Sequence, residues 1–160
     1  MRTEAGTPDR VLLPVPDAPD AVVNLHATAV AFGGRGLLIL GRAGSGKSTL
    51  ALRLMALGAG LVADDQTMLR LDAGDVLLDA PPAIAGLIEA RGMGLLEAAP
   101  TGPVPLALIV DLDQTETARL PPQRAAYVLG YPFRLLHAAP GPAFPEALLQ
   151  ALKGGVRPLA

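Results

Sequence analysis

Cysteine is missing from this chain of 160 residues, and aromatic residues make up only 3% of it. Without cysteine the protein forms neither disulfides nor thiolate metal sites, and a cytoplasmic location is expected. With so few aromatic rings, the core has to be built from leucine, valine, isoleucine and alanine. Hydrophobic residues reach 51% of the sequence, which is enough for such a core. Lysine is scarce too, since Lys47 and Lys153 are the only two in the chain.

An excess of basic residues is also missing, as are long apolar runs. The formal net charge is −2, whereas proteins that bind nucleic acid usually carry an excess of lysine and arginine. Apolar runs such as Gly36–Leu40 are far too short to span a membrane, and the polar N-terminus lacks the apolar stretch of a signal peptide. We therefore expect neither a nucleic acid nor a membrane as a partner.

The length fits one folded domain, over residues 21–155, preceded by an N-terminal arm over residues 1–20 with a short strand near Val11–Val15. Short apolar or alternating runs predict strands at 24–32, 37–40, 61–63, 67–71, 76–78, 106–112, 127–129 and 133–136. Helices are predicted over 47–57, where leucines recur at i, i+4 and i+7 before Gly58, and over 144–152. Residues 87–96 contain two glycines and are not expected to be helical. This order of elements predicts an α/β core with a mixed sheet.

The segment Gly41–Ser48 reads GRAGSGKS and matches the phosphate-binding pattern G-x-x-x-x-G-K-[ST] at every fixed position. Glycines allow successive backbone N–H groups to face one anion, and the helix that follows adds its positive end. Lys47 can reach the β- and γ-phosphates, and the Ser48 hydroxyl can ligate Mg²⁺. We assign nucleotide binding to the loop and the residue after it: Gly41, Arg42, Ala43, Gly44, Ser45, Gly46, Lys47, Ser48 and Thr49.

An acidic pair, Asp64-Asp65, ends the next predicted strand. Carboxylates at a strand end beside a phosphate loop are expected to be Mg²⁺ ligands or a catalytic base. Taken alone, the pair could equally be a solvated turn. Taken alone, His26 could be a hydrogen-bonded strand residue and Glu89 a surface carboxylate. The order of these residues along the chain has to decide between a structural and a functional role.

In the order of these residues, the chain resembles the catalytic domain of bacterial HPr kinase/phosphorylase. The resemblance implies a P-loop kinase fold that is similar to PEP carboxykinase. His26 lies fifteen residues before Gly41, and Asp64-Asp65 lie sixteen and seventeen residues after Ser48. A signature of the form E-x-R-G-x-G then follows as Glu89-Ala90-Arg91-Gly92-Met93-Gly94. The resemblance covers residues 22–137 and is firm to about residue 97.

The resemblance implies roles position by position. Asp65 would be the base that takes the proton of a substrate serine, Lys47 would hold ATP, and His26 would be an accessory active-site residue. Ser48, Glu89 and Asp64 would ligate Mg²⁺. Arg91, Gly92 and Gly94 would form a signature loop at the catalytic wall, and Arg119 would contact phosphate. The two glycines would either permit close backbone approach or simply form a turn.

The sequence departs from the family pattern in three places. Thr49 stands where the family usually has Glu. Longer members carry a separate N-terminal domain, and we expect this protein to lack it. A late segment like V-R-P-G-R-N, tied to the dephosphorylating reaction, is replaced by residues 138–143 without arginine, and an anion site lacking arginine is weaker. Kinase activity is therefore expected more strongly than phosphorylase activity.

The function expected is an ATP- and Mg²⁺-dependent protein serine kinase that acts on HPr or an HPr-like phosphocarrier. It would regulate carbon metabolism or the phosphotransferase system, and the resemblance implies a homohexamer. A P-loop kinase for a small molecule would use the same loop and the same Asp65. A non-enzymatic, nucleotide-gated regulator would need only the loop.

Overall fold

The structure is a computed structural model that describes residues 10–157. Within them, the strands are β1 Arg10–Leu13, β2 Val23–Leu25, β3 Thr28–Phe32, β4 Arg35–Leu40, β5 Gly60–Ala63, β6 Thr67–Asp72, β7 Asp75–Asp79, β8 Leu87–Ala90, β9 Gly94–Glu97, β10 Val104–Thr115, β11 Ala125–Val128 and β12 Tyr131–Ala138. The helices are α1 Lys47–Ala56 and α2 Phe144–Gly154, with a 3₁₀ turn at Pro82–Ile84.

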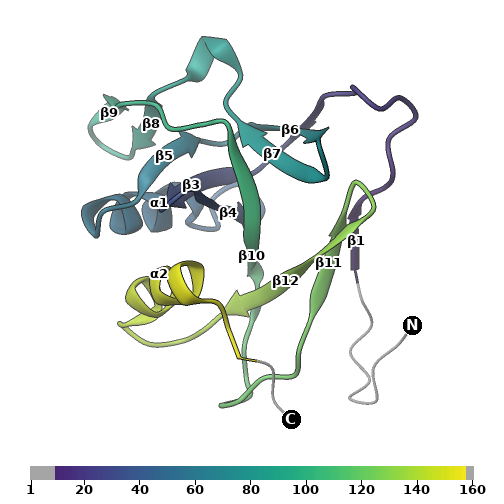
Figure 1. The fold of residues 1–160 in the computed structure, drawn as a ribbon. Coiled ribbons are helices and arrows are strands. Elements are labelled where there is room, and N and C mark those ends of the chain that lie inside the picture. The colour runs from purple at the N-terminus through teal and green to yellow at the C-terminus, as the bar shows by residue number, and fades with distance from the viewer. Residues whose placement is uncertain (1–9, 158–160) are drawn as a thin grey trace.

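One mixed sheet organises the described chain (Figure 1). Its main path runs β1-β11-β12-β10-β4-β3-β5, and β10 lies parallel to both β4 and β12. The first residues of β10 also pair antiparallel with β7, which continues through β6 to β2. The long strand β10 therefore joins two parts of the sheet, and the α/β class with a mixed sheet is confirmed.

The core lies on both faces of this sheet, because β4 is buried along almost its whole length. Its side chains alternate, so that Leu37 and Ile39 pack in the cluster beneath α1 and α2, and Leu38 and Leu40 pack in the opposite cluster. Such a strand reads as a continuous apolar run, as the sequence does. The phosphate loop that follows Leu40 therefore starts from a fixed position.

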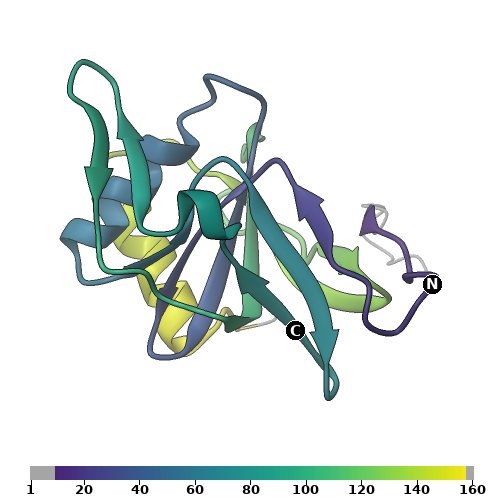
Figure 2. The same ribbon diagram turned by 90° about the horizontal axis from the view of Figure 1, so that it is seen from above.

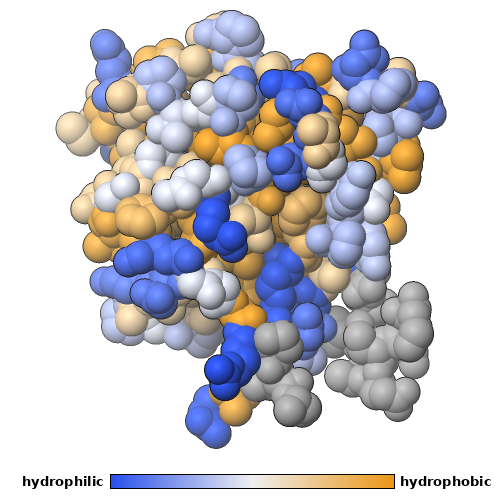
Figure 3. Space-filling model, in the orientation of Figure 1, coloured by the Kyte–Doolittle hydropathy of each residue, from blue (hydrophilic) through white to orange (hydrophobic). Residues whose placement is uncertain are grey.

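Two hairpins extend from the sheet region, and Figure 2 shows one of them, β8–β9, extending outward beside α1. The strands predicted at 67–71 and 76–78 form the β6–β7 hairpin, whose turn has Ala73 and Gly74 at φ 51° and 87°. Residues 87–96, expected not to be helical, form the β8–β9 hairpin. On the face drawn in Figure 3, polar and apolar residues are intermingled.

Two local predictions are wrong. The single strand expected over 24–32 is two strands, because His26 and Ala27 lie between them: β2 pairs with β6, whereas β3 pairs with β4 and β5. The helix α1 ends at Ala56, and Leu57 lies outside it with 42% of its surface exposed. Gly58 does end the helix, with φ 110° and its N–H donating to the Met55 carbonyl.

The N-terminal arm lies partly outside the described residues. Residues 1–9 are not described, and Arg10–Leu13 pairs in parallel with β11. The short strand expected near Val11–Val15 thus begins one residue earlier. Among the described residues, neither helix is long and apolar enough to cross a membrane.

Candidate active site around the phosphate loop

The phosphate loop joins β4 to α1, and within it the Ser45 N–H donates to the Arg42 carbonyl at 3.0 Å. Gly46 caps the helix with φ 100°, and the cap makes no side-chain hydrogen bond. Gly41 is required for a second reason: a Cβ there would lie 2.2 Å from the Ser45 Oγ. The helix end therefore presents backbone donors, as phosphate binding requires.

The Lys47 ammonium is held over this loop. Its Nζ donates to the carbonyl oxygens of Gly41 at 2.8 Å and Arg42 at 3.2 Å, and only 6% of the residue is exposed. Both contacts are to neutral carbonyl oxygens, which leaves the Lys47 ammonium able to pair with an anion on the loop. The role expected for Lys47 in holding ATP stays a prediction.

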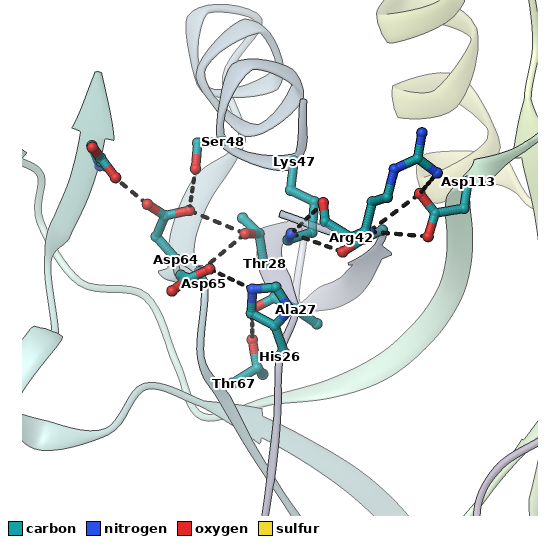
Figure 4. A network of polar contacts seen from close by, with 12 residues as sticks. His26, Ala27, Thr28, Arg42, Lys47, Ser48, Asp64, Asp65, Thr67 and Asp113 are labelled. Atoms are coloured by element: carbon teal, nitrogen blue, oxygen red, sulfur yellow. Dashed lines mark hydrogen bonds and ion pairs between the residues drawn. The ribbon is translucent and has the colours of Figure 1, made fainter. Parts of the chain in front are cut away.

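The Asp64 carboxylate is the centre of a hydrogen-bond network (Figure 4). Its Oδ1 accepts from Ser48 Oγ at 2.7 Å and from Thr28 Oγ1 at 3.0 Å, and its Oδ2 accepts from the Glu89 backbone N–H at 3.1 Å. Asp64 is buried, with 7% exposed. It therefore ties α1, β3 and β8 together behind the loop.

Asp65 points the other way, toward solvent and His26. Its side chain is 64% exposed, and its Oδ1 lies 2.7 Å from the His26 Nε2. The backbone is left-handed at Asp65, with φ 70°, and its N–H donates to Thr28 Oγ1 at 3.1 Å. A non-glycine residue with positive φ stores strain and is held by its surroundings, a feature common at functional sites.

A cavity of about 430 Å³ brings the expected site residues together. It is lined by loop and helix residues and by the acidic pair, Glu89 and Arg91: Ala43, Gly44, Gly46, Lys47, Ser48, Thr49, Asp64, Asp65, Glu89 and Arg91. His26 reaches its edge through the hydrogen bond to Asp65. Residues that are spread from Ala43 to Arg91 along the sequence therefore line one cavity in the fold.

The signature glycines serve the turn of the β8–β9 hairpin. Gly92 and Gly94 have φ 85° and 112°, but a Cβ at either would meet no atom within 4 Å. Positive φ in the hairpin turn therefore accounts for glycine at both positions, which is the plain-turn alternative.

The donors around the cavity fit Mg²⁺. Ser48, Asp64 and Glu89 supply oxygen atoms, and Mg²⁺ usually takes one or two carboxylates, several waters and substrate phosphates. Among residues 10–157, no group of three or more His, Asp or Glu side chains forms a complete protein site for a metal. A magnesium ion at this place would accordingly depend on the phosphates of a bound nucleotide.

Two features of the site were not predicted. Thr28 bonds both acidic residues, and Asp113 accepts from the Arg42 backbone N–H with both oxygens, at 3.2 and 3.0 Å. Sequence reasoning had given Asp113 no role, and its position at the end of the apolar run in β10 was the only signal. Arg119 lies exposed in the segment after β10, and it is not among the described residues that line the cavity.

Replacing Thr28 by valine is expected to destabilise the protein by about 1–3 kcal/mol. Valine keeps the shape of this fully buried side chain but leaves the Asp65 N–H without its acceptor. Urea unfolding measures the change, with Thr117→Val at an exposed position as the control, which should stay within about 0.5 kcal/mol of the parent. Equal stability of the two variants would contradict the role given to Thr28.

A second polar network lies where β10 and β12 end. Arg10 Nη1 donates to the buried Asp111 at 2.6 Å, and Arg124 pairs with Glu116. Burial raises the pKa of Glu116, but hydrogen bonds from Arg124 and the Ala118 backbone outweigh it and hold that pKa below its usual value. Burial, followed by the nearby Arg124, lowers the pKa of His137. His137 is therefore a partly buried residue beside this network.

This burial predicts how stability depends on pH. A histidine whose pKa is lower in the folded than in the unfolded state opposes folding once the pH falls below the unfolded value of about 6.5. Above that pH its contribution vanishes. The parent should lose more unfolding free energy than His137→Gln between about pH 7.5 and 5.5. Parallel slopes for the two proteins in denaturant titrations would contradict this assignment.

Comparison with known proteins found relatives that match the part of the chain containing this site. A family model described as the HPr serine kinase C-terminal domain matches residues 20–101, which include the whole cavity. The HPr kinase/phosphorylase of Cupriavidus metallidurans is 36% identical over 126 residues, covering 71% of this chain and 39% of that protein. The HPr kinase/phosphorylase of Aromatoleum aromaticum is 39% identical over 124 residues, covering 69% of this chain and 40% of that one.

The fold has a match among solved structures as well. The Hpr(Ser) kinase/phosphatase from Coxiella burnetii superimposes with a TM-score of 0.72, over 82% of this chain and 88% of that chain, at 22% identity. The chain spans about two fifths of the length of the two curated relatives. The family model covers just over half of this chain, from residue 20 to residue 101, and the curated relatives carry the same family name. This chain belongs to the HPr serine kinase C-terminal domain family.

Proposed function

We propose that this chain is an ATP- and Mg²⁺-dependent protein kinase that phosphorylates a seryl hydroxyl of HPr or an HPr-like phosphocarrier. The observation that carries the proposal is the exposed Asp65 carboxylate, which lines the same cavity as the buried Lys47. Family membership and the names of the relatives support HPr as the acceptor. A regulatory role in carbon metabolism or the phosphotransferase system would follow from that acceptor.

The reaction is an in-line phosphoryl transfer. The seryl oxygen forms a bond to the γ-phosphorus of ATP, the bond from that phosphorus to the bridging oxygen breaks, and ADP leaves with the bridging oxygen. Asp65 takes the proton of the serine. The hydrogen bond from His26 to Oδ1 fixes the carboxylate and leaves Oδ2 for the incoming hydroxyl.

The remaining side chains supply charge and position. Lys47 and the loop N–H groups hold the phosphates as negative charge shifts toward the leaving oxygen. Mg²⁺, held by Ser48 and Glu89 with Asp64 behind them, would neutralise the β- and γ-phosphates. Asp64 keeps the Ser48 hydroxyl oriented through their 2.7 Å hydrogen bond.

The exposure of Asp65 favours a protein acceptor over a small metabolite. A kinase for a small molecule usually encloses its acceptor, whereas 64% of the Asp65 side chain faces solvent. The reverse phosphorolysis is expected to be weak, because residues 138–143 lack arginine.

An acceptor comparison tests the proposal. ADP release would be measured with ATP and Mg²⁺ in the presence of HPr, and separately with a panel of hydroxylated metabolites. We expect release only with HPr. Release with a metabolite but not with HPr would select a small-molecule kinase, and ATP binding without release on any acceptor would select a nucleotide-gated regulator.

A further inference from the structure

A second cavity of about 370 Å³ adjoins the phosphate loop, and the phosphoryl transfer proposed for the first cavity does not use it. It shares Gly46 and Thr49 with the first cavity, but its lining includes none of the three carboxylates of the first. Its other walls come from α1, the end of β10, the segment after β12 and the start of α2. Its volume lies within the roughly 300–1,000 Å³ typical of small-molecule sites.

The position of the two cavities decides which end of a nucleotide each can hold. They meet at the first turn of α1, where the loop N–H groups would bind a chain of phosphates. Transfer requires the terminal phosphate beside Lys47 and Asp65, in the first cavity. The nucleoside end of the same molecule then leaves the loop toward the second cavity.

The lining of the two cavities agrees with this division. The first is walled by Asp64, Asp65 and Glu89, which suit a metal and a proton but not an apolar base. The second is walled on its apolar side by Leu50, Leu112, Phe144 and Pro145, a surface on which a base can be desolvated and stacked.

A buried hydroxyl in the second cavity also needs a partner. Ser45 Oγ is buried, and within the described part of the chain it makes no hydrogen bond. Such groups in folded proteins usually bond a ligand or water. Ser45 belongs to the loop and lines the second cavity together with the apolar residues, so it lies on the path that the sugar takes if the phosphates lie on the loop.

We propose that the second cavity binds the nucleoside of the phosphoryl donor, with the base stacked on Phe144 and the sugar bonded to the Ser45 hydroxyl. The assignment rests on the proposed function, because that function puts the terminal phosphate of the donor in the first cavity. It predicts that the protein binds ATP more tightly than inorganic tripolyphosphate, which has the phosphates but no nucleoside.

Isothermal titration calorimetry with ATP and with tripolyphosphate, each with Mg²⁺, tests this assignment. Phe144→Leu keeps apolar packing against the core cluster beneath the helices but removes the ring. We expect the dissociation constant for ATP to rise about tenfold, in the range that base stacking supplies, and that for tripolyphosphate to change less than about twofold. The exposed Leu57→Ala should alter neither.

A filling variant provides a second measurement that does not depend on Phe144. Ala139 lines the cavity and is exposed, so a large side chain there can be accommodated without disturbing the core. Ala139→Trp should weaken ATP binding about tenfold or more and leave tripolyphosphate within about twofold.

The outcomes separate this inference from the proposed function. Equal affinity of the parent for ATP and tripolyphosphate, or parallel losses of both in the variants, would overturn the nucleoside site and leave the kinase proposal standing. A parent that binds neither ligand would contradict both.

Discussion

Replacing Asp65 by asparagine is expected to lower phosphoryl transfer to HPr about 10²–10⁴-fold, the usual contribution of a general base. Affinity for ATP should change little, because Asp65 contacts neither the loop backbone nor Lys47. Asparagine is suited to the position: it is among the few residues that tolerate φ 70°, and its side-chain oxygen can still accept from His26. A loss of transfer then reports on the missing base rather than on a changed fold.

Asp72→Asn is the matched control for this variant. Asp72 ends β6, does not line the cavity, and has an exposed side chain like that of Asp65. It should transfer phosphate at the parent rate. The role of Asp65 would be contradicted if its asparagine variant kept more than about a tenth of the parent rate at saturating ATP.

Replacing Lys47 by methionine is expected to weaken ATP binding about 10–150-fold, because a hydrogen bond to a charged group contributes about 1.5–3 kcal/mol. Methionine fills the space of this buried side chain without an ammonium group. Transfer should fall further than affinity does, since the charge acts on the phosphate oxygens during the reaction. Calorimetry and initial rates give the two effects separately.

Lys153→Met removes the only other lysine and serves as its control. Lys153 lies 5.4 Å from the centre of the Phe32 ring and does not line the cavity. It should leave ATP affinity within about twofold of the parent. A similar loss of ATP affinity in both lysine variants would point to net charge and would contradict a specific contact from Lys47.

The sequence pattern of a single segment predicted those strands, helices and turns whose backbone conformation depends mainly on that segment. The apolar run of β4, the leucines of α1 and the glycines of the loop each constrain their own backbone, so the loop was located from the sequence alone. The strongest buried run, 106–112, was found too, although β10 extends to Val104–Thr115. Its ends pair with different partners, which the sequence of one strand does not encode.

The parts of the site that were missed depend on contacts between distant segments. Thr28 reads as one more alternating residue in a strand, and only the approach of β3 to the end of β5 places its hydroxyl between Asp64 and Asp65. The interruption of the predicted strand 24–32 at His26 also depends on distant segments, because β2 pairs with β6 whereas β3 pairs with β4. Resemblance to a family supplied the grouping of Asp65 with His26, which the separation of 39 residues hides.

The identity of the phosphorylated residue on HPr is the most direct test of the account. HPr would be incubated with ATP, Mg²⁺ and the parent protein or Asp65→Asn, and the phosphorylated residue located by mass spectrometry of proteolytic fragments. The account predicts one phosphoserine with the parent and almost none with the variant over the same time. Phosphate on histidine, no phosphate at all, or equal phosphoserine with both proteins would contradict it.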